Sequence, residues 1–312
     1  MRYSMKSVLE VSRVSRQAAH KYFKRQDVYQ KKLSGLILEA DLLRSEHPGC
    51  GVEKMYATLL PDWLGRDKFI SIFMDIGYRV KTQKNYQRTT IPVHSGYKNL
   101  IEGLMVREKN IVWQTDITYY YLDSRYYYLV FIIDVYTKKI LGYKASEHLR
   151  AEANHIALKM ALKNSSGSLT RLIHHSDRGS QYIEKRYTDL LKNNGIQISM
   201  GAKAQDNAYA ERINGTIKNE YLKYWGPKNY RELKSMLCKA VDHYNNKRIH
   251  NNLPVGMSPV QFEKSLLDLT SQRRPTVIIY AEGNYKIKVA SSHFDFKPKE
   301  EPLAHNCPIE IN

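Results

Sequence analysis

The sequence predicts a mixed α/β domain in the middle of the chain, preceded by a region that is entirely helical. Residues 111–145 contain three runs of apolar, aromatic and β-branched residues, which is the composition of neighbouring strands. Residues 151–200 then alternate between helical spacing and short apolar runs, so helix and strand are expected to follow each other. Before residue 77, by contrast, apolar residues recur mainly at the three-and-four spacing of helices.

Strands and helices in the middle and C-terminal parts of the chain follow from spacing and caps. The first two strands are joined by the polar turn Asp123-Ser124-Arg125. Asn229 with Glu232, and Ser258 with Gln261, have the spacing of capping boxes, and the second is followed by a proline at the first helical position. The expected strands are 111–122, 126–137, 139–145, 172–176 and 196–200, the expected helices are 151–163, 184–193, 230–245 and 259–267, and residues 276–280 and 284–289 are expected to pair as a hairpin.

Short helices are expected throughout the N-terminal region. Ser15 fits the N-cap of a helix that runs through Lys24. The segment His47-Pro48-Gly49 ends the next helix, and Gly77 is expected to cap the last one. The expected helices are two within residues 1–25, broken near 12–15, and then 27–46, 52–60 and 66–76, the last with Phe69, Ile72, Phe73 and Ile76 facing inward.

The helix expected at 16–24 separates into two faces. Its apolar side carries Ala18, Ala19, Tyr22 and Phe23. The opposite side of this helix is polar and largely basic. Such a face suits the recognition helix of a helix-turn-helix, which enters the major groove of DNA. The alternative is an ordinary solvated face of an amphipathic helix. The polar face comprises Arg16, Gln17, His20, Lys21 and Lys24, which are therefore candidate DNA-binding residues.

The composition points to a polyanionic partner. A formal net charge of +18 favours nucleic acid, because lysine and arginine that neutralise phosphates release counterions. An anionic membrane surface is the alternative, but no apolar run approaches the roughly 20 residues needed to span a bilayer, and no signal peptide opens the chain. We therefore expect a cytoplasmic protein. Residues 77–100 hold five lysines or arginines and no acid, which indicates a basic linker lying along DNA or simply a soluble one.

Three acidic residues stand out from the other acids because of their surroundings. Asp116 interrupts an apolar and aromatic run, where an unpaired carboxylate is costly to bury, and Asp177 follows another strand-like run. Glu211 lies on a helix further along the chain. Carboxylates from three segments suit Mg²⁺, which takes oxygen ligands and leaves room for phosphate oxygens. The alternative for each acid alone is a solvated surface group. Asp134, on the second strand, is expected to be structural or a helper.

The helix that carries Glu211 is expected to present this residue while it packs on the core. Its sequence, DNAYAERINGTIK from Asp206 to Lys218, places apolar residues on one stripe and polar residues on the next. The apolar stripe contains Ala210, Ile213 and Ile217, and the polar stripe contains Asn207, Glu211, Asn214, Gly215 and Lys218.

These segments together resemble a known family. WQTDITYY, FIIDVYTKKILGY, HHSDRGSQY and DNAYAERINGTIKNE, in this order, are similar to the integrase core of bacterial insertion-sequence transposases of the DDE class, which is related to retroviral integrases. The resemblance is greatest to the second-frame transposases of the insertion-sequence-three family and extends from about Lys31 to Phe262. It implies a ribonuclease H-like core with a mixed five-stranded sheet, in which Asp116 lies beside Asp177.

The same resemblance implies roles for particular residues. Asp116, Asp177 and Glu211 match the catalytic, metal-binding triad. Lys218 matches a basic position that contacts DNA near the active site, and Asn207 matches a polar position that helps to place the strand end. The implied cofactor is Mg²⁺, with Mn²⁺ as a substitute, and no glycine-rich phosphate loop suggests a nucleotide cofactor.

The sequence therefore predicts a transposase that binds element ends, cuts DNA strands and joins 3′-hydroxyl ends to target DNA. The implied partners are double-stranded DNA and further copies of the same chain, in the cytoplasm at the bacterial nucleoid. A metal-dependent nuclease of the same fold and a catalytically inactive DNA-binding regulator are the alternatives. The expected domains are a helix-turn-helix (1–30), a second helical DNA-binding domain (31–90), a basic linker (91–108), the catalytic core with its following helices (109–262) and a C-terminal extension (263–312).

Overall fold

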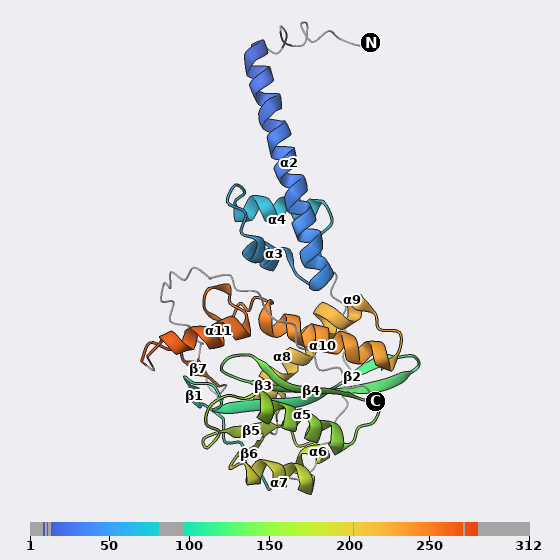
Figure 1. Ribbon diagram of the computed structural model, residues 1–312, viewed down its shortest axis with the longest axis vertical. Helices are drawn as coiled ribbons and strands as arrows, with labels where there is room; N and C mark the ends of the chain where they lie inside the picture. The colour runs from blue at the N-terminus through green and yellow to red at the C-terminus, as the bar shows by residue number, and fades with distance from the viewer. Residues whose placement is uncertain are drawn as a thin grey trace. The chain divides into compact units, whose positions relative to one another are not determined.

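The structure of the protein, a computed structural model, describes residues 14–80, 96–201, 203–270 and 272–279, together with residues 9 and 11. The chain divides into two compact units, shown in Figure 1. The first unit contains residues 1–46 and 50–79, and the second contains residues 47–49 and 80–312. Residues 81–95, which belong to the predicted basic region, and the second half of the predicted C-terminal hairpin lie outside the described residues.

The first unit consists of helices α2 (Arg16–Glu46), α3 (Val52–Leu59) and α4 (Arg66–Asp75). Ser15 caps α2 as predicted, because its Oγ accepts a hydrogen bond from the N–H of Ala18 (3.1 Å). The predicted break between Lys24 and Asp27 is wrong, because α2 runs without interruption from Arg16 to Glu46, over 31 residues. Nothing in this stretch breaks a helix, and Asp27 forms an ion pair with Lys31 one turn later (2.8 Å). The domain boundary expected at residue 30 therefore falls inside a helix.

The short helices of this unit pack their aromatic residues as expected. Phe69 and Phe73 are fully buried and stack on each other, with ring centroids 4.1 Å apart. Gly77 has a φ of +94°, and the N–H of Tyr78 bonds back to the carbonyl of Phe73 (2.9 Å), so α4 ends in the predicted glycine cap. Ile76 was expected to face inward, but it is 49% exposed because it occupies the C-cap itself, where the helix has already ended.

The second unit is built on a five-stranded sheet in the order β4-β3-β2-β5-β6. The first three strands are antiparallel neighbours, whereas β5 and β6 run parallel to β2. The sheet is therefore mixed, and its order is that of the predicted ribonuclease H-like core. The strands are β2 (Val112–Leu122), β3 (Arg125–Asp134), β4 (Ile140–Ser146), β5 (Ile173–Ser176) and β6 (Gln197–Met200).

The two turns of the antiparallel part are tight. Asp123 and Ser124 both have positive φ, which gives the two-residue turn that suits a hairpin, and Arg125 already belongs to β3. Asp134 ends β3 and is buried, where it accepts hydrogen bonds from the backbone N–H groups of Asn110 and Thr137 (both 2.7 Å). Asp134 is thus structural, which was one of the two roles expected for it.

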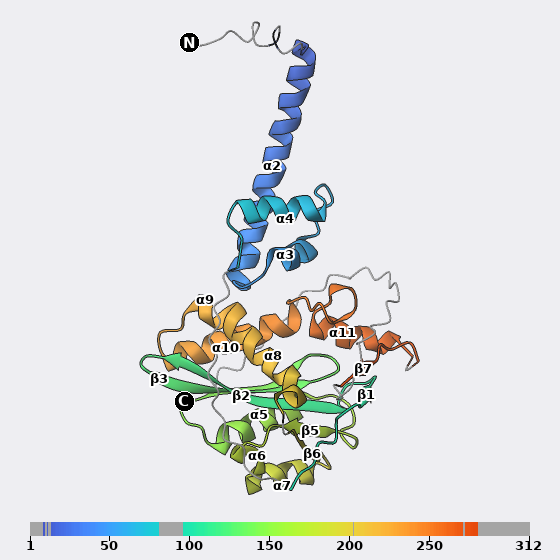
Figure 2. The same cartoon turned by 180° about the vertical axis from the view of Figure 1, so that it is seen from behind.

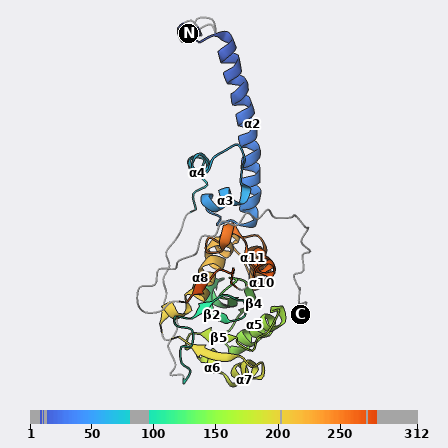
Figure 3. The same ribbon diagram turned by 90° about the vertical axis from the view of Figure 1, so that its left-hand side faces the viewer.

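Helices cover both faces of the sheet, as the side view in Figure 3 shows. One face packs against α5 (Ala151–Asn164), α6 (Ser180–Ile183) and α7 (Lys185–Asn193). The other face packs against α8 (Ala208–Thr216), the π-helix η2 (Ile217–Leu222) and α10 (Tyr230–Asn246). Figure 2 shows α8 lying across β2 on this second face. The fourth strand and the helix that carries the glutamate are thereby brought to the strand that carries Asp116.

The remaining elements surround the end of the sheet. The helix α11 (Pro259–Ser265) begins at the predicted capping box, in which Ser258 and Gln261 bond to each other's backbone N–H groups. The strand β7 (Val277–Ile278) was expected to pair with residues 284–289, and those residues lie outside the described ones. In the structure β7 pairs with β1 (Met105–Val106), a strand that the sequence did not indicate. The short elements η1 (Ala204–Asn207), α9 (Lys223–Trp225), η3 (Pro254–Gly256) and η4 (Leu266–Asp268) complete this unit.

Over the described ranges, no helix has the length and hydropathy of a bilayer-spanning segment.

Candidate active site

Asp116 lies on the side of β2 that faces α8. Successive strand residues point to opposite faces, so Asp116 shares this side with Gln114 and Thr118. One carboxylate oxygen of Asp116 accepts a hydrogen bond from the N–H of Ile117 (2.9 Å). The other accepts one from Nδ2 of Asn214 on α8 (2.7 Å). The carboxylate is therefore half-buried and held in place from both the strand and the helix.

Asp177 reaches the same place from the neighbouring strand. In the parallel pair of β2 and β5, Gln114 lies opposite His175. Asp116 and Asp177 each come two residues later, and the two side chains are therefore neighbours. Oδ1 of Asp177 accepts a hydrogen bond from the N–H of Gly179 (3.0 Å), which orients the carboxylate at the end of the strand. The register of the sheet thus supports the expectation, implied by the family resemblance, that these two acids meet.

The three acids of the predicted triad interact electrostatically. Burial, the charge of Asp177 and, less strongly, the charge of Glu211 together raise the pKa of Asp116 to about 8, against the lowering effects of the Ile117 N–H and Lys218. The pKa of Asp177 is also raised by burial, against the N–H of Gly179. Partial burial and the charge of Asp177 raise the pKa of Glu211, which is the most exposed of the three. All three carboxylates thus favour a nearby positive charge.

A divalent cation fits the chemistry of this cluster. Carboxylate oxygens are the ligands that Mg²⁺ prefers, and a cation would stabilise the ionised carboxylates against burial and against the repulsion that helps to raise the pKa values of Asp116 and Glu211. Among the residues that the structure describes, no three His, Cys, Asp or Glu side chains are placed so that they could hold an ion together as they stand. Asp116 and Asp177 are the neighbouring pair, and the exposed Glu211 is the side chain with freedom to complete a site.

The polar stripe predicted on the Glu211 helix faces β2. Nδ2 of Asn207 donates a hydrogen bond to the carbonyl of Thr115 (2.8 Å). The ammonium of Lys218 donates one to Oγ1 of Thr118 (2.6 Å), and Asn214 bonds to Asp116 as described above. The apolar stripe is buried, as expected, with Ala210, Ile213 and Ile217 each no more than 2% exposed. Asn207 is itself buried, and in this structure it holds β2 to the helix rather than facing solvent.

Two residues of the site had no predicted role. Asn214 was placed on the polar stripe but was not expected to bind Asp116 directly. Gln114 precedes Asp116 by two residues and is buried, with its side chain bonded to the start of α8. Strand alternation is the signal that could have found Gln114, because a polar residue two positions from a buried acid must share its face.

The predicted DNA-reading face lies on the first part of α2. Arg16, Gln17, His20, Lys21 and Lys24 are all exposed there. The apolar side chains opposite them are also largely exposed, with Tyr22 at 58% and Phe23 at 57%. Most of the stretch in which the other helix of a helix-turn-helix was expected, residues 1–8, 10 and 12–13, lies outside the described residues.

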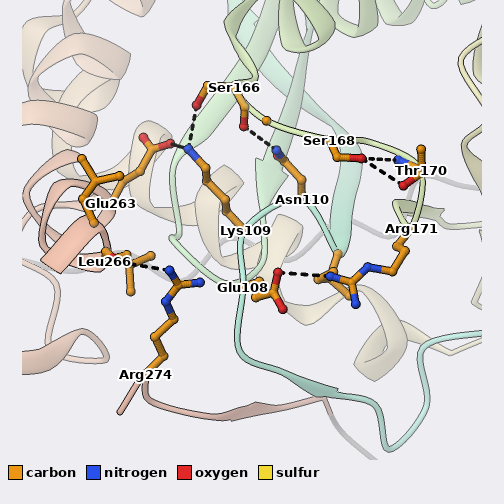
Figure 4. Close-up of a pocket in the computed structure, with 13 residues that line it drawn as sticks. Glu108, Lys109, Asn110, Ser166, Ser168, Thr170, Arg171, Glu263, Leu266 and Arg274 are labelled. Atoms are coloured by element: carbon orange, nitrogen blue, oxygen red, sulfur yellow. Dashed lines mark hydrogen bonds and ion pairs between the residues drawn. The ribbon is translucent and has the colours of Figure 1, made fainter. Parts of the chain in front are cut away.

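A pocket of the second unit is separate from the acids. It has a volume of about 220 Å³ and lies beside Lys109, Asn110, Ser166, Arg171 and Glu263 (Figure 4). Its walls are formed by the segments that lead into β2 and β5, whereas Asp177 follows the far end of β5. Since these strands are parallel, the pocket and the acids occupy opposite ends of the sheet.

Glu263, at the wall of this pocket, joins α11 to the sheet. Its two oxygens bond to the ammonium groups of Lys109 (2.8 Å) and Lys139 (2.5 Å). Burial opposes the charge of Glu263, but the two lysines together outweigh it and lower its pKa. Its contribution to stability is therefore present above the ordinary glutamate pKa and is lost as the pH falls.

We expect Glu263→Gln to lower the free energy of unfolding by about 1 to 3 kcal/mol at pH 7, because it leaves two half-buried ammonium groups without a countercharge. Thermal melting as a function of pH measures this. The difference between the variant and the wild type should shrink as the pH falls below 4.5, where Glu263 becomes protonated in the unfolded chain. A difference that is the same at pH 4 and pH 7 would show that the lysine pairs contribute nothing.

Comparison with known proteins identifies the family. Models of the integrase core domain match residues 106–205 and 194–256. A 31 kDa protein of the insertion element IS600 from Shigella sonnei is 34% identical over 209 residues, which are 64% of this chain and 75% of the relative. The chain belongs to the insertion-sequence transposases with an integrase core. It is a DDE-type polynucleotidyl transferase of the insertion-sequence-three type.

Two further relatives are described as transposases. The transposase of the insertion sequence element IS629 from Shigella sonnei is 36% identical over 49% of this chain and 52% of its own length. A putative transposase for IS986/IS6110 from Mycobacterium tuberculosis is 29% identical over 68% of this chain and 81% of its own length. Among solved structures, the catalytic core domain of the HTLV-2 integrase in complex with magnesium is 19% identical, with a TM-score of 0.40 over 53% of this chain and 99% of that one.

Proposed function

We propose that this transposase cuts DNA at the ends of its element and joins the 3′-hydroxyl ends to target DNA at Asp116, Asp177 and Glu211. The observation that supports the proposal is the cluster of three carboxylates, from a central strand, the end of its neighbour and a covering helix, in which the charge of Asp177 raises the pKa values of both Asp116 and Glu211. Bound between them, two Mg²⁺ ions, or Mn²⁺ in their place, would activate the attacking oxygen and stabilise the leaving one. Asp116 and Asp177 would hold the first ion, and Glu211 would complete the second.

The residues around the acids would prepare them for this task. Asn214 fixes one oxygen of Asp116, so that the carboxylate presents a defined edge. The N–H of Gly179 does the same for Asp177. Lys218 lies close enough to Asp116 for its charge to favour the ionised carboxylate. A cation at this position suits a DNA phosphate that approaches the acids.

Glu211→Gln tests the proposal, because it keeps the size of the side chain and removes its charge. We expect the purified variant to bind element-end duplex normally and to form neither cleaved nor joined product with Mg²⁺. Glu152→Gln, at an exposed position of α5, is the matched control and should behave as wild type. Joining by the Glu211 variant at a rate near wild type would remove Glu211 from the triad. Cleavage without joining by the wild type would instead favour a metal-dependent nuclease, and inactivity of the wild type on end duplexes would favour a regulator.

Lys218→Ala should reduce strand joining and make DNA binding less dependent on salt by about one counterion. The physical reason is that the half-buried ammonium, held by Thr118, lies beside the acids and can bind a backbone phosphate as a point charge. Lys218→Arg should largely preserve both properties. A joining assay and a salt titration of DNA binding measure them, and an Ala variant that matches wild type in both would make Lys218 a structural residue.

We further propose that the exposed polar face of α2 recognises the element ends. Replacing Arg16 and Gln17 by Ala should weaken binding to end sequences more than to random duplex, since a good base contact is worth about 1 to 3 kcal/mol of discrimination. The remaining cations of this face, with His20, would contact the DNA backbone. Binding isotherms on the two duplexes measure this difference, and equal losses on both would leave only a general electrostatic attraction.

The assembly and the location of the protein are also proposals. Joining two ends to one target requires two active sites, which favours several copies of the chain on DNA, in the bacterial cytoplasm at the nucleoid. Sedimentation of the full chain with and without end duplex measures the first point. One copy per duplex at all protein concentrations would contradict it.

A further inference from the structure

Gln114 connects the strand of Asp116 to the helix of Glu211. It is 1% exposed and lies on β2, two residues before Asp116 and on the same face. Its side-chain oxygen accepts hydrogen bonds from the N–H groups of Tyr209 (3.1 Å) and Ala210 (3.3 Å). Its side-chain nitrogen donates one to the carbonyl of Asp206 (3.0 Å). Both the oxygen and the nitrogen of this side-chain amide are therefore bonded to the backbone of three residues that shortly precede Glu211.

The first turn of α8 needs such a partner. The first N–H groups of a helix have no acceptor within the helix, and the N-cap side chain usually accepts from the second or third of them. Asn207 is the N-cap of α8, but its side chain makes no capping bond, since its nitrogen donates to Thr115 instead. The second and third N–H groups of α8 belong to Tyr209 and Ala210. Gln114 thus performs the capping role from another element.

A second contact holds the same turn. The ammonium of Lys138, in the turn after β3, lies 3.9 Å from the centre of the Tyr209 ring, and Lys138 is 4% exposed. The turn that precedes Glu211 is thereby fixed through its backbone by β2 and through its aromatic side chain by the turn between β3 and β4. With the backbone of this turn and the Tyr209 ring both held in place, the side chain of Glu211 is the part of the turn that remains free to rotate.

We propose that Gln114 is a positioning residue, which sets the place of Glu211 relative to Asp116 by capping α8 from β2. This inference rests on the proposed function, in which both acids act together. Without the cap, the first turn of α8 frays and Glu211 is no longer held at a fixed distance from the strand. A displacement of about 1 Å at a reacting centre can cost on the order of a hundredfold in rate.

The experiment replaces Gln114 by Met, which keeps the length of the side chain and removes its three hydrogen bonds. The matched control is Ser258→Ala, which removes the buried N-cap of α11. Amide hydrogen exchange of the full chain, resolved to residues 208–211, reports the cap directly, because the N–H groups of Tyr209 and Ala210 belong to the first turn and have no acceptor within α8. Strand joining, end-duplex binding and the melting temperature are measured on the same samples.

We expect Gln114→Met to speed exchange at Tyr209 and Ala210 by about fivefold to tenfold, which corresponds to the loss of one ordinary hydrogen bond. Joining should fall by about tenfold to a hundredfold, with DNA binding unchanged. Ser258→Ala should lower the melting temperature similarly and leave both joining and exchange at α8 near wild type. Gln114→Asn, which is one methylene too short to reach, should repeat the result if the Met variant does not fold.

Unchanged exchange at Tyr209 and Ala210 in the variant would overturn the capping inference, whatever happens to joining. Faster exchange with normal joining, or a loss of joining no greater than that of Ser258→Ala, would leave Gln114 a merely structural residue. If the proposed function is wrong, the result is different. The Glu211→Gln variant would then join strands normally, while amide exchange at the start of α8 would still depend on Gln114.

Discussion

Asp116→Asn is expected to abolish strand joining and at the same time to stabilise the fold. The loss of joining should be at least roughly a thousandfold, because several kcal/mol of transition-state stabilisation depend on the charge of the carboxylates. The gain in stability follows from the raised pKa of Asp116, which burial and the other two acids bring to about 8. Asparagine keeps the acceptor for Asn214 and carries no charge.

The pH dependence of this gain has a definite sign. A carboxyl group whose pKa is higher in the folded state destabilises the fold when it ionises, so the penalty grows as the pH rises from about 4 to about 8. At pH 8 we expect Asp116→Asn to be more stable by on the order of 2 kcal/mol, or several degrees in melting temperature. The measurement is thermal melting in EDTA, with the exposed Asp268→Asn as the control. Equal stability of Asp116→Asn and wild type at pH 8, or a gain that persists unchanged at pH 4, would contradict the assignment.

Gly142→Ala should destabilise the second unit by about 3 kcal/mol, which is the upper range for overpacking a core. Gly142 lies on β4 directly under α5, and a Cβ there would overlap the carbonyl oxygen of Ala157. Because the obstructing atom belongs to the backbone of a helix, the overlap cannot be relieved by rotating a side chain. The helix must move away from the sheet, which loosens its packing.

Chemical denaturation measures this loss, and Gly215→Ala provides the control in the same unit. Gly215 lies within α8, where an added Cβ meets only Nδ2 of Asn219 at 4.0 Å. There alanine should stabilise the helix by up to about 1 kcal/mol through its better helical propensity. Two variants with the same chemical change should thus shift stability in opposite directions. A shift of the same sign for both would show that α5 does not approach β4 as closely as the structure describes.

The strands of the core could be predicted because their residues satisfy a local rule. The apolar run of β2 and the polar turn after Leu122 define the hairpin without any knowledge of the fold. The position of Asp116 on that strand was therefore clear from the sequence. The meeting of Asp116 with Asp177 was not, since it depends on the parallel register of β2 and β5, and it came from the family resemblance.

Features that depend on tertiary contacts were predicted less well. The break expected after Lys24 was wrong because Arg25, Gln26 and Asp27 include no proline or glycine that would end a helix. The partner of β7 was missed because Met105 and Val106 are too few residues to form a recognisable strand pattern. Gln114 was overlooked for a related reason. Its role is visible only when the N-terminus of α8, distant in sequence, is placed against β2.

The crowding of contacts on one strand has a consequence for how this gene can vary. Gln114, Thr115, Asp116 and Thr118 each bond to the helical segment from Asp206 to Lys218, and all but Thr115, which offers its carbonyl, do so from the same side of β2. Deleting or inserting a single codon between Gln114 and Asp116 would turn every later side chain of β2 to the opposite face of the sheet, and Asp116 would then face α5. The hairpin tip at Asp123 and Ser124 has no such constraint. Insertions and deletions among descendants of this gene should therefore accumulate at the hairpin tip. The segment from Gln114 to Thr118 should align among them without gaps.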